Sequence, residues 1–384
     1  MPAEPDAGLG LPAGAAGVLP AQWLRKACAN GLVRSRWTID ADSVQPASLD
    51  LRLGEKAYRL QCSFLPESDR VEDKLADLAM GELDLRDGAV LEQNRPYLIP
   101  LIEHLELPEG LAAKANPKSS TGRLDLFTRV ITDRSYKFDE IPAGYTGTLY
   151  LEVVSRSFTV KVQTGLSLNQ LRLVAGDGAL SDDDIVNQHC DRSPLVWFAD
   201  DPVPAAELAV SRGLLLSLDL SGEDDRRLVG YRAKKNSQLI DLSKIGHYDA
   251  EEFWEPVTAD RRRRIVLEPE EFYLLLSREG VSVPPDLAAE MTAYDPTSGE
   301  LRTHYAGFFD PGFGFRAGTG GPGSRAALEV RAHDVPFMVE HGQRVCTLTY
   351  ERTLETPDVL YGATSSHYQF QTQALSKHFR ARGG

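Results

Sequence analysis

The chain has 384 residues, of which 42% are hydrophobic and 26% are charged, and its formal net charge is -14 at pH 7. This length suggests two or three domains, and this composition is that of an ordinary soluble protein. The acidic excess argues against general binding to nucleic acid or to a membrane surface, because both need a basic face. The four cysteines are widely separated, which indicates neither a zinc knuckle nor a disulfide framework and favours a cytoplasmic protein.

Taken in chain order, the sequence predicts few helices and many strands. Helical patterns cover residues 20–30 and 73–80, and residues 360–379 are ambiguous. Short apolar runs, broken by Pro, Gly and Asp clusters, are typical of strands. In the first half of the chain they cover residues 97–101, 111–115, 148–154 and 158–162. We expect a mainly β fold with a few short helices, closed as small barrels or distorted jelly rolls.

An internal repeat organises the chain. The segment that begins Tyr97-Leu-Ile-Pro is echoed by one that begins Tyr273-Leu-Leu-Leu. Leu-Glu-Val at Glu152 is likewise echoed by Leu-Glu-Val at Glu329, at nearly the same separation. Two similar domains in tandem explain both matches. We expect them to span residues 1–195 and 196–384.

Two motifs in the first repeat indicate chemistry. Residues 118–123, Lys-Ser-Ser-Thr-Gly-Arg, offer cationic and hydroxyl donors to a polyanion, and the glycine allows close backbone approach. Glu152 follows in a strand-forming run with apolar neighbours, an environment that could tune a general base. Plainer interpretations are a serine-rich turn and a solvent-facing glutamate. The second repeat has acidic residues in the place of the first motif, at 295–302, so only the first repeat keeps the combination.

Three other patterns do not support a site. His104-Leu-Glu106 begins like a zinc-deaminase signature, but the two cysteines of that signature do not follow, so no zinc is expected. Residues 318–323 match Gly-x-Gly-x-x-Gly, but Pro322 argues against a dinucleotide turn. The eight histidines are scattered and no Gly-x-Ser-x-Gly motif accompanies them, which gives no support to a nucleophilic triad.

The chain resembles the dCTP deaminases, in a long form with two domains of the trimeric dUTPase-like β fold. The resemblance rests on residues 48–54, 118–123, 131–134 and 144–147 and on Glu152, which follow one another in the family's order. It implies an enzyme, a hydrolase acting on a C–N bond, that converts dCTP to dUTP and ammonia in pyrimidine deoxynucleotide metabolism. No protein-bound metal is implied, and Mg²⁺ is expected on the phosphates of the substrate.

The resemblance also assigns roles to particular residues. Glu152 becomes the general base, with Ser119 and Arg123 ordering the attacking water and the developing charge. The implied substrate-binding residues are Lys118, Ser120 and Arg123 for the phosphates, Thr132 and Arg134 for the pyrimidine, Asp139 and Tyr145 for the deoxyribose, and Tyr361, His367 and Gln371 in a tail that closes over the triphosphate. The chain departs from the family at Lys118, where arginine is usual, at His367, where lysine is usual, and in extra residues around 136–140.

Two alternative functions stay open. One is a dUTP pyrophosphatase, or a bifunctional enzyme that proceeds to dUMP, using water activated by Asp139 or Asp310. The other is a non-catalytic regulator that binds nucleotides. The second domain is expected to act as a scaffold that supplies the closing tail. Because sites in this fold lie between subunits, a homo-oligomer, a trimer or larger, is expected.

Overall fold

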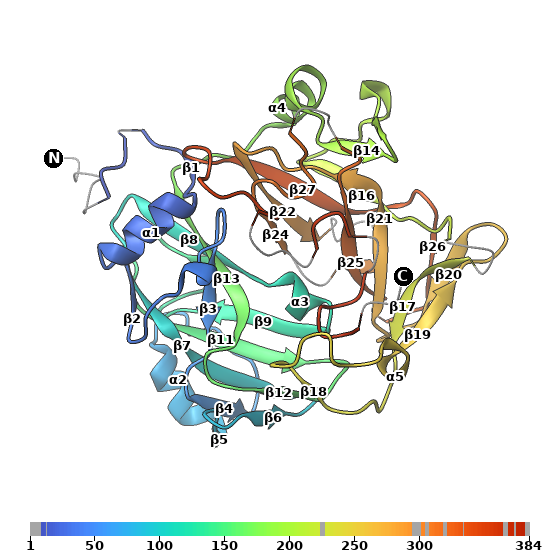
Figure 1. Ribbon diagram of the computed structural model, residues 1–384. Helices are drawn as coiled ribbons and strands as arrows, with labels where there is room; N and C mark the ends of the chain where they lie inside the picture. The colour runs from blue at the N-terminus through green and yellow to red at the C-terminus, as the bar shows by residue number, and fades with distance from the viewer. Residues whose placement is uncertain are drawn as a thin grey trace. The chain divides into compact units, whose positions relative to one another are not determined.

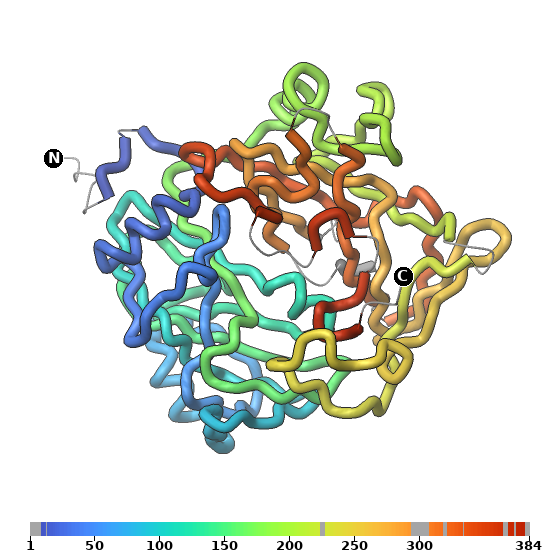
Figure 2. Tube along the Cα trace, viewed as in Figure 1, coloured from blue at the N-terminus to red at the C-terminus, as the bar shows by residue number. Residues whose placement is uncertain are grey.

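The computed structural model describes residues 9–12, 14–222, 227–293, 301–303, 307–317, 321–332, 334–363, 368–371 and 374–380. The fold is mainly β with a few short helices, as the sequence predicts (Figure 1). The chain divides into two compact units. The first unit comprises Met1–Gly178, Ser237–Ile245 and Thr353–Val359, and the second comprises Ala179–Asn236, Gly246–Arg352 and Leu360–Gly384. In the trace of Figure 2 the first unit is mainly blue to green and the second mainly yellow-green to red.

The two predicted helices form. Helix α1 spans Ala21–Ala29 and buries Leu24 and Ala27 on one face. Helix α2 spans Val71–Leu78, two residues earlier than predicted, because the chain turns extended at Ala79 and enters a strand. The remaining helices are short: α3 (Ser119–Gly122), α4 (Asp182–Asn187), α5 (Ala250–Phe253), and single turns at Ala41–Ser43, Gln188–Arg192 and Ala205–Glu207. The described part of 360–379 contains no helix.

The first unit contains three sheets. One has the order β1 (Gly17–Val18), β13 (Ser167–Ala175), β8 (Leu111–Pro117), β10 (Glu140–Ile141), with β3 (Leu49–Arg52) also paired to β13. The second has the order β5 (Ala79–Asp84), β4 (Lys56–Leu60), β7 (Pro96–Glu106), β11 (Thr146–Ser155), β9 (Leu126–Ile131), with β2 (Val33–Ser35) on β7. The third joins β18 (Ile240–Asp241), β12 (Val160–Val162) and β6 (Ala89–Leu91).

The second unit also contains three sheets. One has the order β16 (Leu214–Ser217), β27 (Arg344–Arg352), β22 (Leu287–Ala293), β24 (Gly307–Phe309). Another runs β15 (Asp201–Pro202), β14 (Val196–Phe198), β21 (Tyr273–Val281), β17 (Leu228–Ala233), β19 (Trp254–Thr258), and continues from β21 to β25 (Ser324–Ala332) and β23 (Leu301–Thr303). The third pairs β20 (Arg264–Leu267) with β26 (Phe337–Glu340).

The strand orders of the two units correspond. The order β3-β13-β8-β10 matches β16-β27-β22-β24, and β5-β4-β7-β11-β9 matches β19-β17-β21-β25-β23. Glu152 pairs with Leu98 across β11 and β7, and Glu329 pairs with Leu274 across β25 and β21. The repeat in the sequence therefore has a counterpart in the strand pairing, with the two glutamates at equivalent positions.

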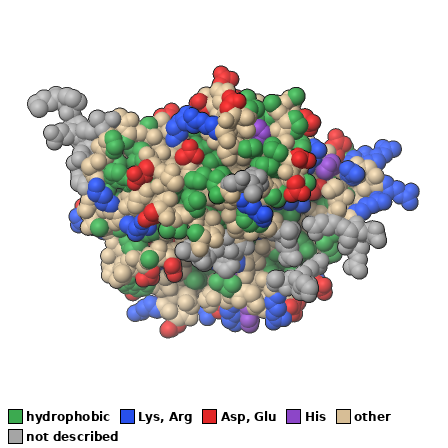
Figure 3. Space-filling view, turned by 45° about the horizontal axis from the view of Figure 1, so that its top comes forward, with side chains coloured by type: hydrophobic (Ala, Val, Ile, Leu, Met, Phe, Trp, Pro, Cys, Tyr) green, Lys and Arg blue, Asp and Glu red, His purple; other side chains and the backbone are tan. Residues whose placement is uncertain are grey.

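Apolar side chains fill each unit. In the second unit a large cluster gathers buried residues from its three sheets, among them Leu216, Leu275, Leu328 and Leu348. In the first unit a smaller cluster joins β4, β7, β9 and β11 with α2. The face drawn in Figure 3 shows acidic and basic side chains interspersed among hydrophobic ones. Among the described residues, no helix has both the length and the apolar character that crossing a membrane requires.

Candidate active site

The segment 118–123 forms a single helical turn directly after a strand. Strand β8 ends at Pro117, and the Lys118 amide is held at the carbonyl of Leu168 on the neighbouring strand (3.0 Å). The Lys118 carbonyl then accepts hydrogen bonds from the amides of Thr121 and Gly122, which closes the turn α3. Ser119 is exposed, whereas Ser120 is buried and Arg123 is only 2% exposed. The turn therefore presents a hydroxyl outward and holds a guanidinium inside.

Lys118 has an anionic partner. Its Nζ makes an ion pair with the Asp50 carboxylate on β3, and both side chains are largely buried. The cation that the sequence assigns to phosphate binding is thus already neutralised by a carboxylate in the same unit. A triphosphate that reaches Lys118 must compete with Asp50 or share the lysine with it.

Glu152 is completely buried in β11, between β7 and β9. The register places Arg129 of β9 directly opposite, and Arg129 Nη2 lies 2.5 Å from Glu152 Oε1. The second oxygen, Oε2, is also buried and accepts no hydrogen bond from the described residues. The motifs in the sequence do not identify Arg129. The signal for it is a charged residue in the strand-forming run 126–131, Leu-Phe-Thr-Arg-Val-Ile.

One strand separates the turn 119–122 from Glu152. Helix α3 packs against β9, and β9 pairs with β11. A buried amide, Asn169 on β13, donates from Nδ2 to Thr128 Oγ1 on β9 (3.3 Å). The turn α3, with its hydroxyl and cationic donors, therefore lies in the same region of the first unit as Glu152 on β11.

The residues expected to read the base and the sugar lie near the connection from β9 to β11. Thr132 is buried, and Arg134 is exposed with a left-handed backbone (φ 57°). Asp139, also left-handed (φ 61°), accepts a hydrogen bond from the Val130 amide through Oδ1 (2.7 Å). Tyr145 is buried and donates its hydroxyl to the Thr148 carbonyl (2.7 Å). Burial raises the pKa of Tyr145, so this phenol stays neutral.

The described tail residues lie in the second unit. Tyr361 packs on Phe313, with ring centroids 5.5 Å apart, and Gln371 Nε2 donates to the Arg325 carbonyl (2.7 Å). Gln369, which the sequence did not single out, accepts from the Gly314 amide (2.9 Å) and donates to the Gly312 carbonyl (3.0 Å). His367 lies outside the described residues, as do 294–300 and 304–306 of the second repeat.

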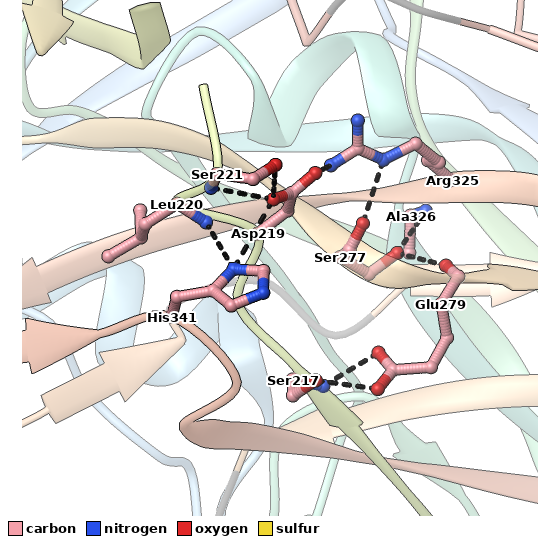
Figure 4. Close-up of polar contacts among 9 residues, drawn as sticks. All are labelled: Ser217, Asp219, Leu220, Ser221, Ser277, Glu279, Arg325, Ala326 and His341. Atoms are coloured by element: carbon pink, nitrogen blue, oxygen red, sulfur yellow. Dashed lines mark hydrogen bonds and ion pairs between the residues drawn. The ribbon is translucent and has the colours of Figure 1, made fainter. Parts of the chain in front are cut away.

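The second unit holds a polar cluster that includes serine, histidine and aspartate (Figure 4). Asp219 accepts from Arg325 Nη2 (2.5 Å) and from the amide and hydroxyl of Ser221. Burial works to raise the pKa of Asp219, but these hydrogen bonds and the Arg325 charge hold it below its usual range. The Leu220 amide donates to His341 Nδ1 (3.1 Å), so that nitrogen is occupied. The aspartate lies between the serine and the histidine, an order that does not form a nucleophilic triad.

Each repeat has a buried glutamate on an equivalent strand, and the two repeats differ in the residue that donates to it. Glu279 is buried and accepts from the amide (2.9 Å) and hydroxyl (2.5 Å) of Ser217 (Figure 4). In the first unit, Glu103 occupies the corresponding strand β7 and accepts from the amide and Nε of Arg52, both at 2.7 Å. These carboxylates join neighbouring strands and are satisfied by protein donors.

Within the described part of the chain, no group of three or more His, Cys, Asp or Glu side chains is arranged to hold a metal ion.

Comparison with known proteins gives the same assignment for both halves of the chain. Residues 15–177 match the N-terminal domain model of 2'-deoxycytidine 5'-triphosphate deaminase (DCD), and residues 184–379 match the C-terminal domain model. The crystal structure of 2'-deoxycytidine 5'-triphosphate deaminase from Agrobacterium tumefaciens is 49% identical in sequence. It superimposes with a TM-score of 0.83 and covers 90% of this chain and 100% of its own.

Shorter relatives match part of the chain. A dCTP deaminase, dUMP-forming, from Sulfurihydrogenibium sp. is 27% identical over 155 residues, 40% of this chain and 81% of the relative. A dCTP deaminase from Ignicoccus hospitalis is 25% identical over 151 residues, 39% of this chain and 79% of the relative. The fold and the matches together define an enzyme of nucleotide metabolism, a hydrolase. The chain belongs to the 2'-deoxycytidine 5'-triphosphate deaminase family.

Proposed function

We propose that this enzyme deaminates dCTP at the first unit, with Glu152 as the general base. The observation that carries the proposal is a fully buried carboxylate, one oxygen of which accepts no hydrogen bond from the described residues. It lies one strand away from the turn that carries Ser119 and Arg123. Burying a carboxylate inside a sheet costs free energy because the charge loses its hydration, and buried charged groups are often found at functional sites. The membership of the chain in the dCTP deaminase family supports cytosine as the reacting base.

The proposed reaction is dCTP plus water to dUTP plus ammonia. Glu152 takes a proton from water as the water oxygen attacks C4 of cytosine, and passes that proton to N3. It then carries the second water proton from the C4 hydroxyl to the amino group, which leaves as ammonia. Ser119 orders the water, and Arg123 stabilises the charge that develops. General base assistance contributes about 10²- to 10⁴-fold, so positioning and electrostatic stabilisation supply much of the remaining acceleration.

Substrate recognition is proposed on the residues that the family resemblance assigns. Lys118, Ser120 and Arg123 bind the phosphates, and Mg²⁺ enters with the triphosphate as part of the substrate. Thr132 and Arg134 contact the pyrimidine, and Asp139 and Tyr145 contact the deoxyribose. The remaining proposed contacts, over the triphosphate, are Tyr361, His367 and Gln371.

The architecture is proposed to follow the family as well. Each repeat is a distorted dUTPase-like barrel, with catalysis in the domain first expected at residues 1–195 and a scaffold in the domain expected at 196–384. The corresponding strand orders of the two units support this proposal. The chain is proposed to assemble as a homo-oligomer, a trimer or larger.

A second candidate is the bifunctional reaction that continues to dUMP and pyrophosphate. It is favoured by the name of a matching relative from Sulfurihydrogenibium sp., a dUMP-forming dCTP deaminase. The two reactions differ in their products, because the first ends at dUTP, whereas the second ends at dUMP and also releases pyrophosphate.

The deciding experiment is a product assay on dCTP with Mg²⁺ that follows ammonia, dUTP, dUMP and pyrophosphate together. The proposal predicts ammonia and dUTP in equal amounts, without pyrophosphate. Equal amounts of ammonia, dUMP and pyrophosphate would identify the bifunctional enzyme. Binding of dCTP without release of ammonia would contradict both catalytic readings.

A further inference from the structure

Burial of Glu152 requires a partner, and the partner comes from the adjacent strand. The carboxylate is 0% exposed, between Leu98 on one neighbouring strand and Arg129 on the other. A carboxylate removed from water is strongly destabilised unless an opposite charge and hydrogen bonds compensate. Arg129 supplies both through the contact of its Nη2 with Glu152 Oε1, at 2.5 Å. The pair is therefore part of how the first unit tolerates this glutamate.

Arg129 is itself held from three sides. The same Nη2 donates to Ser63 Oγ (2.8 Å), in the connection between β4 and α2. The guanidinium carbon lies 3.6 Å from the ring centroid of Phe138 and 4.5 Å from that of Phe127. Such cation–π contacts are stabilising and restrict the planar group to one orientation. Arg129 is thus fixed by strand β9, by the Ser63 segment and by the loop that carries Phe138.

Phe138 connects this arrangement to the segment that departs from the family pattern. It lies in the loop between β9 and β10, within the extra residues around 136–140. Its ring packs against the cluster formed by Leu60, Val71, Leu98, Ile131 and Tyr150. The loop is therefore anchored by apolar packing and presents an aromatic face to Arg129. The extra residues have a defined place in the first unit, next to the glutamate's partner.

The two oxygens of Glu152 differ as a result. Oε1 accepts a hydrogen bond from Arg129, whereas Oε2 is buried and accepts no hydrogen bond from the described residues. We propose that Arg129 is the positioning residue of the general base, fixing Glu152 through Oε1 so that Oε2 takes the proton from the attacking water. This inference rests on the proposed function of Glu152.

The proposed step is balanced and leaves Arg129 unchanged. First, water gives one proton to Oε2 as its oxygen bonds to C4 of cytosine, and Oε2 passes that proton to N3. Oε2 then takes the remaining hydroxyl proton and delivers it to the amino group as the C–N bond breaks, which leaves a carbonyl at C4 and releases ammonia. Arg129 stays on Oε1 throughout and touches neither water nor base. Its loss should therefore lower kcat, which depends on alignment, and leave KM nearly unchanged, because a misplacement of about 1 Å can cost about 10²-fold in rate.

The experiment compares Arg129→Gln, Arg129→Lys and Phe138→Leu with wild type, in kcat and KM for dCTP and in Tm. We expect Arg129→Gln to lower kcat about 10²-fold with KM changed less than about twofold. Arg129→Lys keeps the charge without the planar fork, so it should recover part of kcat. Phe138→Leu keeps apolar packing and removes the ring face, so a fall in kcat of about threefold to tenfold is expected.

The matched control is Arg52→Gln, which breaks another largely buried arginine–glutamate pair of the first unit, that with Glu103. It should lower Tm without lowering kcat of the folded enzyme. Unchanged or increased kcat in Arg129→Gln would overturn the inference. If Arg129→Gln does not fold, unchanged kcat in Arg129→Lys together with Phe138→Leu would overturn it. Retained turnover in Glu152→Gln would instead remove the proposed function itself, so the two failures are distinguishable.

Discussion

Lys118 and Asp50 form an ion pair in the first unit, which joins the turn α3 to strand β3. The lysine is the first residue of the motif that is proposed to bind phosphate, and the carboxylate repels any phosphate that approaches it. The two charges have opposite effects on an anionic ligand. Asp50 therefore limits the affinity that Lys118 can give.

Asp50→Asn should lower KM for dCTP, because it removes one negative charge from a site proposed to hold a triphosphate. The expected decrease is about fivefold at low salt, corresponding to about 1 kcal/mol for a partly buried pair, and less at high salt. Steady-state kinetics at two salt concentrations measure it. Asp84→Asn, which breaks the exposed pair with Arg86, is the control and should leave KM unchanged. An increase in KM for Asp50→Asn would show that Asp50 positions Lys118 productively.

Local patterns in the sequence predicted helices and strands well where the spacing of apolar residues matches the face that is buried in the fold. Helix α1 fell within the expected range because Leu24 and Ala27 are spaced to share one buried face. The strand expected at 148–154 lies within β11, Thr146–Ser155, since strand formers continue beyond the apolar run. The expected strand 97–101 extends to β7, Pro96–Glu106, because the partly exposed His104 and Glu106 alternate with the buried Glu103 and Leu105. Boundaries were less predictable than the existence of the elements.

Relationships between distant segments could not be read from the sequence. Arg129 faces Glu152 only because β9 and β11 pair in one particular register. The pairing of β18 with β12 brings Ile240 beside Val160, and nothing in either short run specifies the other. Asp50 meets Lys118 through the pairing of β3 and β8 with the same strand, β13. Sequence motifs identify the candidate site residues, whereas the residues that pair with them are set by the tertiary structure.

Gly280→Ala should destabilise the second unit. A Cβ at this position would lie 1.8 Å from the Pro322 carbonyl oxygen, and a backbone atom cannot move away as a side chain can. The cost should be about 3 kcal/mol, which lowers Tm by at least about 5 °C. Gly81→Ala is the control, because nothing lies within 4 Å of its added Cβ. Thermal unfolding followed by circular dichroism measures both, and an unchanged Tm for Gly280→Ala would contradict this packing.

The second unit should lose stability in mild acid because it contains a buried histidine, His189, and a partly buried one, His341. His189 Nδ1 accepts from the Leu195 amide (3.0 Å), and its Nε2 donates to the Val203 carbonyl (2.8 Å). Burial lowers the pKa of His189, and burial likewise lowers the pKa of His341 against the opposing effect of Asp219. Their contribution to stability is complete above the unfolded pKa of about 6.5 and is lost as the pH falls below it.

Tm measured between pH 8 and pH 5 tests this prediction. Tm should stay level above about pH 6.5 and fall below it. His189→Gln keeps an acceptor and a donor but does not titrate, so its Tm should fall less steeply in the same range. A wild-type Tm that is constant from pH 8 to pH 5, or an unchanged slope in His189→Gln, would contradict the assignment of a neutral buried histidine.

The two repeats provide an internal test of the central claim, since Glu152 and Glu329 occupy equivalent strand positions and only Glu152 is accompanied by the Lys118–Arg123 motif. The most direct measurement is kcat for ammonia release from dCTP in Glu152→Gln and in Glu329→Gln, each checked for folding by Tm. If Glu152 is the general base, Glu152→Gln should lose at least about 10³-fold in kcat, within the range that general base catalysis supplies, and Glu329→Gln should keep the wild-type rate. Retained activity in Glu152→Gln, or its loss in a folded Glu329→Gln, would contradict that claim.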